Sequence, residues 1–249
     1  MNIITAKKNE SLKTTCKHCN LEKICFSSGL STDGMANFER ATEKTLKVKK
    51  KQPVFKRGDR LDSIYAIKSG SIKTSITSAR GQIQVLGFHL PSHLIGFDGF
   101  ADSRHTCDAI ALEDTLLCEL SLQDFESLCD VLPSMRKIML QQVGAEISRH
   151  HNIALTLGQM QTEERLATYL LRLSCSFKRL GYSCLSYNLP MPRHDLANFL
   201  GMAPETLSRM FARLEQANIM QINKREITIL DLDALQELSH ELCSADDSR

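Results

Sequence analysis

From residue 48 onward the chain alternates short apolar runs with glycine turns. The segment IYAIKSGSIKTSIT reads as a strand, a Ser-Gly turn and a second strand, and QIQVLGFHL, HLIGF and AIALEDTLLCEL repeat this pattern. Regular short strands with glycine turns predict an antiparallel barrel or roll. We therefore expect a β-roll domain over residues 26–135.

The pattern then changes to that of one long helix. Residues 134–158 contain no proline and carry apolar side chains at the spacing of a coiled-coil heptad. Such a stripe predicts a dimerisation helix over residues 136–158, and hence a homodimer. A helix that packs only on its own domain is the alternative. The predicted stripe consists of Met139, Val143, Ile147, His150 and Ala154.

A second pair of helices is predicted between residues 191 and 217. Gly201 stands where the first of them ends and the chain must turn. Pro204 suits the first position of the next helix, where a missing N–H has no cost. The following segment IMQINKREITIL reads as two strands around a charged turn. We therefore expect a winged helix-turn-helix domain over residues 159–249. The buried stripe of its second helix consists of Leu207, Met210, Phe211 and Leu214.

The other face of this second helix is polar. Glu205, Ser208 and Arg209 lie together near its amino-terminal end, where a recognition helix contacts base edges in the major groove. Arginine can pair with guanine, glutamate can accept from cytosine N4, and serine suits several partners. Thr206 and Arg213 join them as candidate DNA contacts. The alternative is a helical hairpin whose charged side chains face water.

Charge and length narrow the choice of function. The 249 residues are enough for two modest domains, and the net charge of +2 gives no bulk basicity. Any DNA affinity must therefore come from local placement of charge. Lys224 and Arg225, in the predicted wing turn, are placed either to contact phosphate or to form an ordinary polar turn.

Several classes of protein are not expected. No apolar run approaches the roughly 20 residues that a membrane span needs, and the segment MNIITAKKNESLKTT lacks the apolar core of a secretory signal. We therefore expect a cytoplasmic protein without membrane contact. A phosphate loop, an HExxH motif and a GxSxG motif are all absent from the sequence, so an enzyme is not expected.

The nine cysteines suggest metal chemistry. Without an export signal they are expected as reduced thiols or ligands, not as a disulfide framework. Cys16, Cys19 and Cys25 are spaced C-x2-C-x5-C within the segment 1–25, and thiolates suit zinc or iron–sulfur clusters. Free thiols near a chain end are the alternative. Either metal centre needs a fourth ligand, and the candidates are His18, Cys107, Cys118 and Cys129.

In this order the parts resemble the CRP/FNR family of bacterial transcription regulators, and most closely its oxygen-sensing FNR branch. The resemblance covers nearly the whole chain. It is carried by the cysteine spacing and by the segments IYAIKSGSIK, GFHLPSHLIGFD, LLCEL, EERLA and ETLSR. It implies an α+β fold with a cyclic-nucleotide-binding-like β-roll, a long dimerisation helix and a winged helix-turn-helix. It also selects Cys118, in LLCEL, as the fourth ligand.

The resemblance further implies a [4Fe-4S] cluster held by Cys16, Cys19, Cys25 and Cys118. The cluster-bearing dimer would bind a TTGAT-N4-ATCAA-like palindrome, read by the E-x-x-S-R residues of ETLSR, and would act on RNA polymerase. Oxygen would convert the cluster to [2Fe-2S] and then destroy it, and the dimer would dissociate. A zinc-stabilised regulator and a thiol-redox switch without metal are the alternatives.

Two departures from related patterns matter. His150 stands where the FNR prototype has an aspartate that keeps the clusterless form monomeric. Histidine carries no negative charge, so we expect the clusterless protein to dimerise more readily. Phe97 stands where a cyclic-nucleotide site carries a ribose-binding glutamate, and RHTCDA replaces its Arg-Ser-Ala phosphate grip. Cyclic nucleotide is therefore not an expected ligand.

Overall fold

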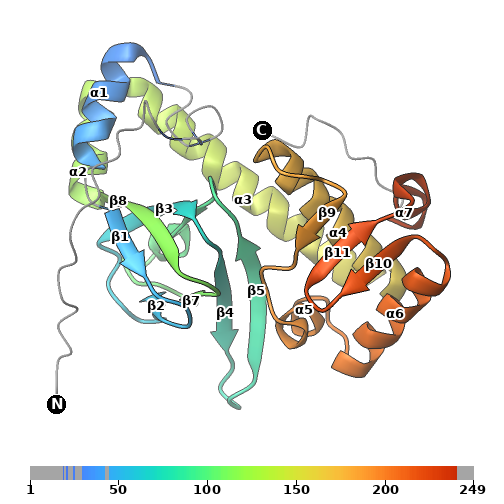
Figure 1. The fold of residues 1–249 in the computed structure, drawn as a ribbon. Helices are drawn as coiled ribbons and strands as arrows, with labels where there is room; N and C mark the ends of the chain where they lie inside the picture. Colours follow the sequence, from blue (N-terminus) through green and yellow to red (C-terminus); the bar gives the residue numbers. More distant parts are fainter. Residues whose placement is uncertain (1–18, 20, 22–24, 26–29, 43–44, 240–249) are drawn as a thin grey trace. The chain divides into compact units, whose positions relative to one another are not determined.

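The structure, a computed structural model, describes residues 19, 21, 25, 30–42 and 45–239 (Figure 1). These residues form two compact units. The first comprises the described residues up to 76 together with 88–140, and the second comprises residues 77–87 and the described residues from 141 onward. Most of the predicted cysteine-bearing segment 1–25, Cys16 included, lies outside the described residues.

The strands between residues 45 and 121 form two four-stranded sheets. Their orders are β1–β8–β3–β6 and β2–β7–β4–β5, and the pairs β1–β8, β3–β8 and β4–β7 are antiparallel. This arrangement confirms the predicted β-roll. The strands are β1 (Thr45–Val48), β2 (Pro53–Phe55), β3 (Ser63–Ser69), β4 (Ile72–Thr77), β5 (Ile83–His89), β6 (Leu94–Ile95), β7 (Asp108–Ala111) and β8 (Thr115–Ser121).

Apolar side chains of the strands contribute much of the buried core of the first unit. Ile64, Ile67, Ile72 and Leu117 are among its fully buried side chains. A one-turn 3-10 helix, η3 (Phe97–Gly99), follows β6. Two helices accompany the sheets, α1 (Thr32–Ala41) and α2 (Leu122–Val131).

The long helix predicted from the heptad pattern is α3 (Pro133–Gln159), which runs for 27 residues. Its first turns contribute Met135 and Met139 to a core cluster that also contains Ile64, Leu120 and Cys129. The amino-terminal end of α3 is therefore fixed by apolar packing within the first unit.

The second unit contains the predicted winged helix-turn-helix, and adds one strand to it. The strand β9 pairs with β11, so the wing belongs to a three-stranded sheet of order β10–β11–β9. The sequence analysis did not predict β9, because a strand of three residues is too short to show a hydrophobic period. The elements are α4 (Thr162–Arg179), β9 (Ser186–Asn188), α5 (Arg193–Phe199), α6 (Pro204–Gln216), β10 (Met220–Asn223), β11 (Glu226–Ile229) and α7 (Leu232–Ser239).

Candidate functional site

The turn between α5 and α6 is built as the sequence predicts. Gly201 has φ 63°, a left-handed conformation that glycine adopts without steric cost. A Cβ at this position would lie 3.2 Å from Leu157 Cδ2. Ala203 is the N-cap of α6 and offers no side-chain cap, while Pro204 occupies the first turn. Glycine thus permits the geometry of the turn, and proline suits the first position of α6.

Arg165, the arginine of EERLA, ties this turn to its surroundings. Its guanidinium donates to the carbonyls of Leu157 (2.8 Å) and Leu200 (3.2 Å), and its Nε donates to that of Met160 (3.0 Å). These carbonyls belong to the end of α3, the α3–α4 connection and the end of α5. One side chain therefore supplies hydrogen bonds to backbone carbonyls at or near two helix ends, where the helices themselves leave carbonyl groups without a donor.

The two faces of α6 divide as predicted. Leu207, Phe211 and Leu214 are buried, and Met210 is half-buried. The predicted base-reading side chains, Glu205, Ser208 and Arg209, are all exposed. They lie in the first two turns of the helix, so the structure presents them on one accessible face.

Neighbouring groups orient some of these polar side chains. The Arg209 guanidinium donates to Thr206 Oγ1 at 3.2 Å, and Ser208 Oγ donates to the carbonyl of Pro204 at 3.0 Å. Arg213 forms an ion pair with Glu163 of α4, with 3.4 Å between Nη1 and Oε2. Its role as a DNA contact stays a prediction, as do those of the other four.

The two cations of the wing turn, which the sequence analysis treated alike, make different contacts in the structure. Lys224 and Arg225 are both exposed, but the Arg225 guanidinium donates to backbone carbonyls of Leu189 and Pro190. The sequence analysis also overlooked Arg193, the first residue of α5, which donates to the Lys224 carbonyl at 3.1 Å. No local motif marks these contacts, since each joins residues more than 30 positions apart.

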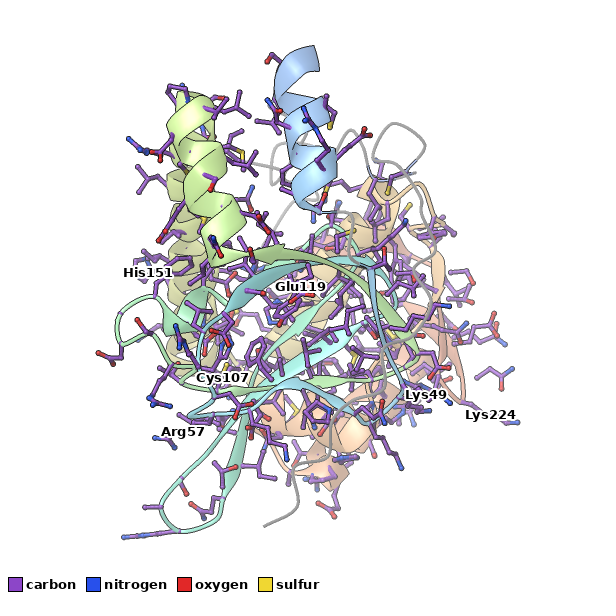
Figure 2. The ribbon with its side chains drawn as sticks, turned by 90° about the vertical axis from the view of Figure 1, so that its left-hand side faces the viewer. Lys49, Arg57, Cys107, Glu119, His151 and Lys224 are labelled. Atoms are coloured by element: carbon purple, nitrogen blue, oxygen red, sulfur yellow. The ribbon has the colours of Figure 1, made fainter. Side chains whose placement is uncertain are left out.

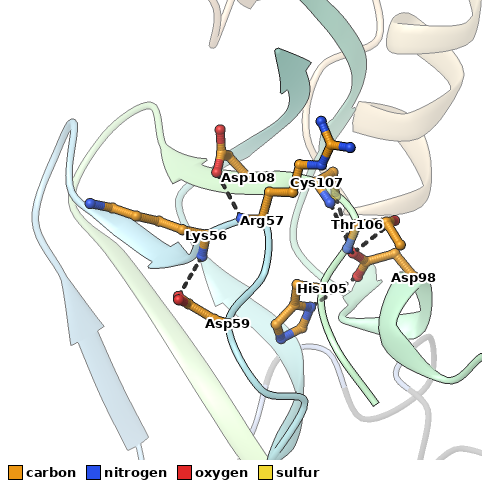
Figure 3. Close-up of polar contacts among 8 residues, drawn as sticks. All are labelled: Lys56, Arg57, Asp59, Asp98, His105, Thr106, Cys107 and Asp108. Carbon is orange, nitrogen blue, oxygen red and sulfur yellow. Dashed lines mark hydrogen bonds and ion pairs between the residues drawn. The ribbon is translucent and has the colours of Figure 1, made fainter. Parts of the chain in front are cut away.

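A polar cluster occupies the β-roll where the segment RHTCDA lies (Figure 3). The Asp98 carboxylate accepts from the backbone N–H groups of Thr106 (2.6 Å) and Cys107 (3.2 Å). It also lies 3.1 Å from Nδ1 of the buried His105. Burial by itself raises the pKa of Asp98, but the bonds from His105 and Thr106 outweigh burial and hold the pKa below its usual value. The backbone N–H groups of this part of the loop therefore donate hydrogen bonds to a carboxylate of the protein itself, and not to a bound phosphate.

Three cysteines of the predicted ligand set lie among the described residues, and all three are half-buried and not disulfide-bonded. They are Cys19, Cys25 and Cys118. Cys118 lies in β8, paired with Thr45 and Ala66. Thiolates suit an iron–sulfur cluster, so the donor types fit. Over the described part of the chain, however, no three cysteine, histidine or acidic side chains form a group that could hold a metal ion. The four-cysteine ligand set therefore stays a prediction.

One cysteine departs from the expectation of reduced thiols. Cys175 of α4 is disulfide-bonded, whereas Cys107, Cys129 and Cys184 form no disulfide. The spacing of Cys175 in the sequence gave no sign of a partner, because pairing depends on proximity in the fold.

The predicted dimerisation stripe on α3 is mostly accessible. Ile147 is 51% exposed, and His150 and Ala154 are also exposed. Val143 is half-buried. Met139 instead packs into the core of its own unit. Its neighbour Leu140, absent from the predicted stripe, is 72% exposed, so Leu140 is the accessible apolar side chain at this end of the helix.

Comparison with known proteins connects both units to characterised families. Residues 45–131 match the cyclic nucleotide-binding domain family, and residues 164–238 match the Crp-like helix-turn-helix domain family. Among the described helices, none combines the length and apolarity of a membrane span.

Several curated proteins are similar over nearly their whole length. The fumarate and nitrate reduction regulatory protein of Escherichia coli K12 is 33% identical, covering 90% of each chain. The transcriptional activator protein anr of Pseudomonas aeruginosa is 35% identical, covering 92% of this chain and 91% of its own. Among solved structures, FixK2 from Bradyrhizobium japonicum superposes with a TM-score of 0.73 at 22% identity, covering 80% of this chain and 98% of its own.

Proposed function

Because this chain belongs to the CRP/FNR family of transcription regulators, we propose that it is an oxygen-responsive regulator of anaerobic gene expression. The family consists of DNA-binding regulators, not enzymes. The names of relatives, among them the anaerobic regulatory protein of Haemophilus influenzae, support the anaerobic assignment. The protein would work in the cytoplasm, where RNA polymerase is the partner of a DNA-bound regulator.

The exposed face of α6 is the observation that carries the DNA-binding part of this proposal. Glu205, Ser208 and Arg209 are accessible on the first two turns, where a recognition helix contacts base edges. In this proposal they read each half of a TTGAT-N4-ATCAA-like palindrome. A palindrome matches a two-fold dimer, because each protomer presents the same helix to one half-site.

Dimerisation is assigned to the accessible stripe of α3. The exposed apolar side chains Leu140 and Ile147 are seven residues apart, the repeat of a coiled-coil seam. Val143 and Ala154 complete the stripe, and Met139 is replaced by Leu140 because Met139 is committed to its own core. The partner that packs on this stripe is a second copy of this chain, in keeping with its family membership.

Oxygen control is assigned to a [4Fe-4S] cluster held by Cys16, Cys19, Cys25 and Cys118. When bound, such a cluster supplies a centre that oxygen can break down. The chain itself supplies a connection to the dimer helix, because Cys25 packs against the core cluster that contains Met135 and Met139 of α3. A ligand set that favours the dimer-competent arrangement of this core shifts the population toward it.

Replacement of Arg209 tests the DNA-reading assignment. Arg209→Ala removes the guanidinium and should cost about 1–3 kcal/mol of discrimination at one position of the half-site. Binding would be measured under anaerobic conditions by fluorescence anisotropy, on the palindrome and on duplexes with single base changes. Gln216→Ala, at the exposed far end of α6, is the matched control and should retain full preference. If Arg209→Ala also retains it, α6 is not the reading helix.

A further inference from the structure

The turn of the wing has a backbone that its own residues do not favour. Asn223 of β10 pairs with Glu226 of β11, so Lys224 and Arg225 form a two-residue turn. Lys224 has φ 56°, a left-handed conformation that turns of this kind normally assign to glycine, asparagine or aspartate. Residues held in such conformations persist where surrounding contacts determine them. The wing turn is therefore held in place by other parts of the unit.

Arg225 provides the first set of these contacts. Its Nε donates to the Leu189 carbonyl at 2.9 Å, and its Nη2 donates to the Pro190 carbonyl. In return, the Leu189 N–H donates to the Arg225 carbonyl at 2.8 Å. Both the side chain and the backbone of Arg225 thus bind the segment that leads into α5.

Arg193 provides the second set. Its guanidinium lies 4.1 Å from the ring centroid of Phe211, a buried residue of α6. It also donates to the carbonyl of Lys224 at 3.1 Å. One half-buried arginine therefore connects the start of α5, the recognition helix and the wing turn. A guanidinium has a fixed fork of donors, which suits it to hold such a geometry.

Lys224 differs from both arginines in what its side chain faces. It is exposed, and Figure 2 shows it extending away from the ribbon. We propose that Arg193 and Arg225 are positioning residues that hold the wing turn, and that Lys224 is the side chain of this turn that contacts a DNA phosphate. This proposal rests on the DNA-binding function proposed above. It deepens that function by assigning different roles to three cations of the same domain.

Salt dependence distinguishes a phosphate contact from a positioning contact. Each phosphate neutralised on duplex DNA contributes about −0.9 to the slope of log K against log salt. A homodimer carries two wings, so Lys224→Gln should reduce the steepness of this slope by about 2. The loss should be equal on the palindrome and on a scrambled duplex, because phosphates carry no sequence information.

The decisive test combines Lys224→Gln with Arg225→Gln. If Arg225 acts only through Lys224, the single variants and the double variant all lose about 2 in slope, and their affinity losses do not multiply. If Arg225 contacts phosphate itself, the double variant loses about 4 and the affinity losses multiply, as expected of independent contacts. The second result would overturn the proposal, as would an unchanged slope for Lys224→Gln.

Two further variants guard against a trivial outcome. Arg225→Lys keeps the charge but cannot reproduce the two-carbonyl fork, so it should bind as weakly as Arg225→Gln; wild-type affinity in Arg225→Lys would contradict positioning. Lys178→Gln removes an exposed cation of α4 and should leave the slope unchanged. Failure of the proposed function would look different: the wild-type protein would then show no preference for the palindrome, while the slopes on scrambled DNA would still report on the wing.

Discussion

At the scale of single residues, the Asp98 side chain accepts the hydrogen bonds of a whole loop segment. Its carboxylate accepts hydrogen bonds from the backbone N–H groups of Thr106 and Cys107 and lies beside the imidazole of His105. His105 in turn stacks on Phe55, with ring centroids 3.6 Å apart. The position is well suited to a carboxylate, because even a half-buried anion needs several hydrogen-bond donors. In this chain the donors of the loop are thus occupied by an internal group.

The depressed pKa of Asp98 makes a prediction about stability and pH. The folded state holds the carboxyl ionised at pH values where the unfolded chain binds a proton, so stability rises with pH through the range just below the ordinary carboxyl pKa of 3.8. Asp98→Asn should therefore destabilise the protein by about 1.5–3 kcal/mol at pH 7, the usual worth of a charged hydrogen bond. The difference from wild type should shrink as the pH falls toward 3.

Urea unfolding at pH 7 and near pH 3 checks this. Asp102→Asn is the control, because Asp102 lies on the same loop but is exposed, and it should change stability little at either pH. An Asp98→Asn deficit that is the same at both pH values would show that the carboxylate charge is not what stabilises the loop.

At the scale of elements, α3 has two faces, one packed in a core and one exposed. Met135 and Met139 face the core of the first unit, while Leu140 and Ile147 face outward. Within the outward stripe, His150 is oriented by its own helix, since its Nδ1 lies 2.9 Å from the carbonyl of Glu146. In the proposed dimer seam, a polar but not anionic residue at this position would avoid the mutual repulsion of two carboxylates.

This makes the charge at position 150 a test of the dimer helix. The clusterless wild-type protein should be a dimer at tens of micromolar, and His150→Asp should make it a monomer, because two like charges then face each other across the seam. Sedimentation velocity measures both states. Gln141→Asp adds the same charge at an exposed position outside the stripe and should leave the dimer intact. A monomeric clusterless wild type would refute the expectation.

At the scale of the whole molecule, local signals predicted the architecture well. Gly201 and Pro204 mark the end of one helix and the start of the next, and the heptad pattern marks α3, because each of these signals depends on near neighbours in sequence. The Asp98 cluster, the Arg225 contacts and the Cys175 disulfide were not predicted. Each depends on groups that only the tertiary fold brings together, and no spacing rule indicates them.

The comparisons confirm the family and the fold, whereas the oxygen-labile cluster is the central proposal. Its most direct test is an absorption spectrum of protein purified without oxygen, with iron and sulfide assays, repeated after air is admitted. We predict a broad band near about 400 nm and about four irons per chain, both lost in air. Cys118→Ser should lack the band, and Cys184→Ser, which replaces a free half-buried thiol of the second unit, should keep it. A colourless protein that contains zinc and resists reconstitution would contradict the oxygen-sensing proposal.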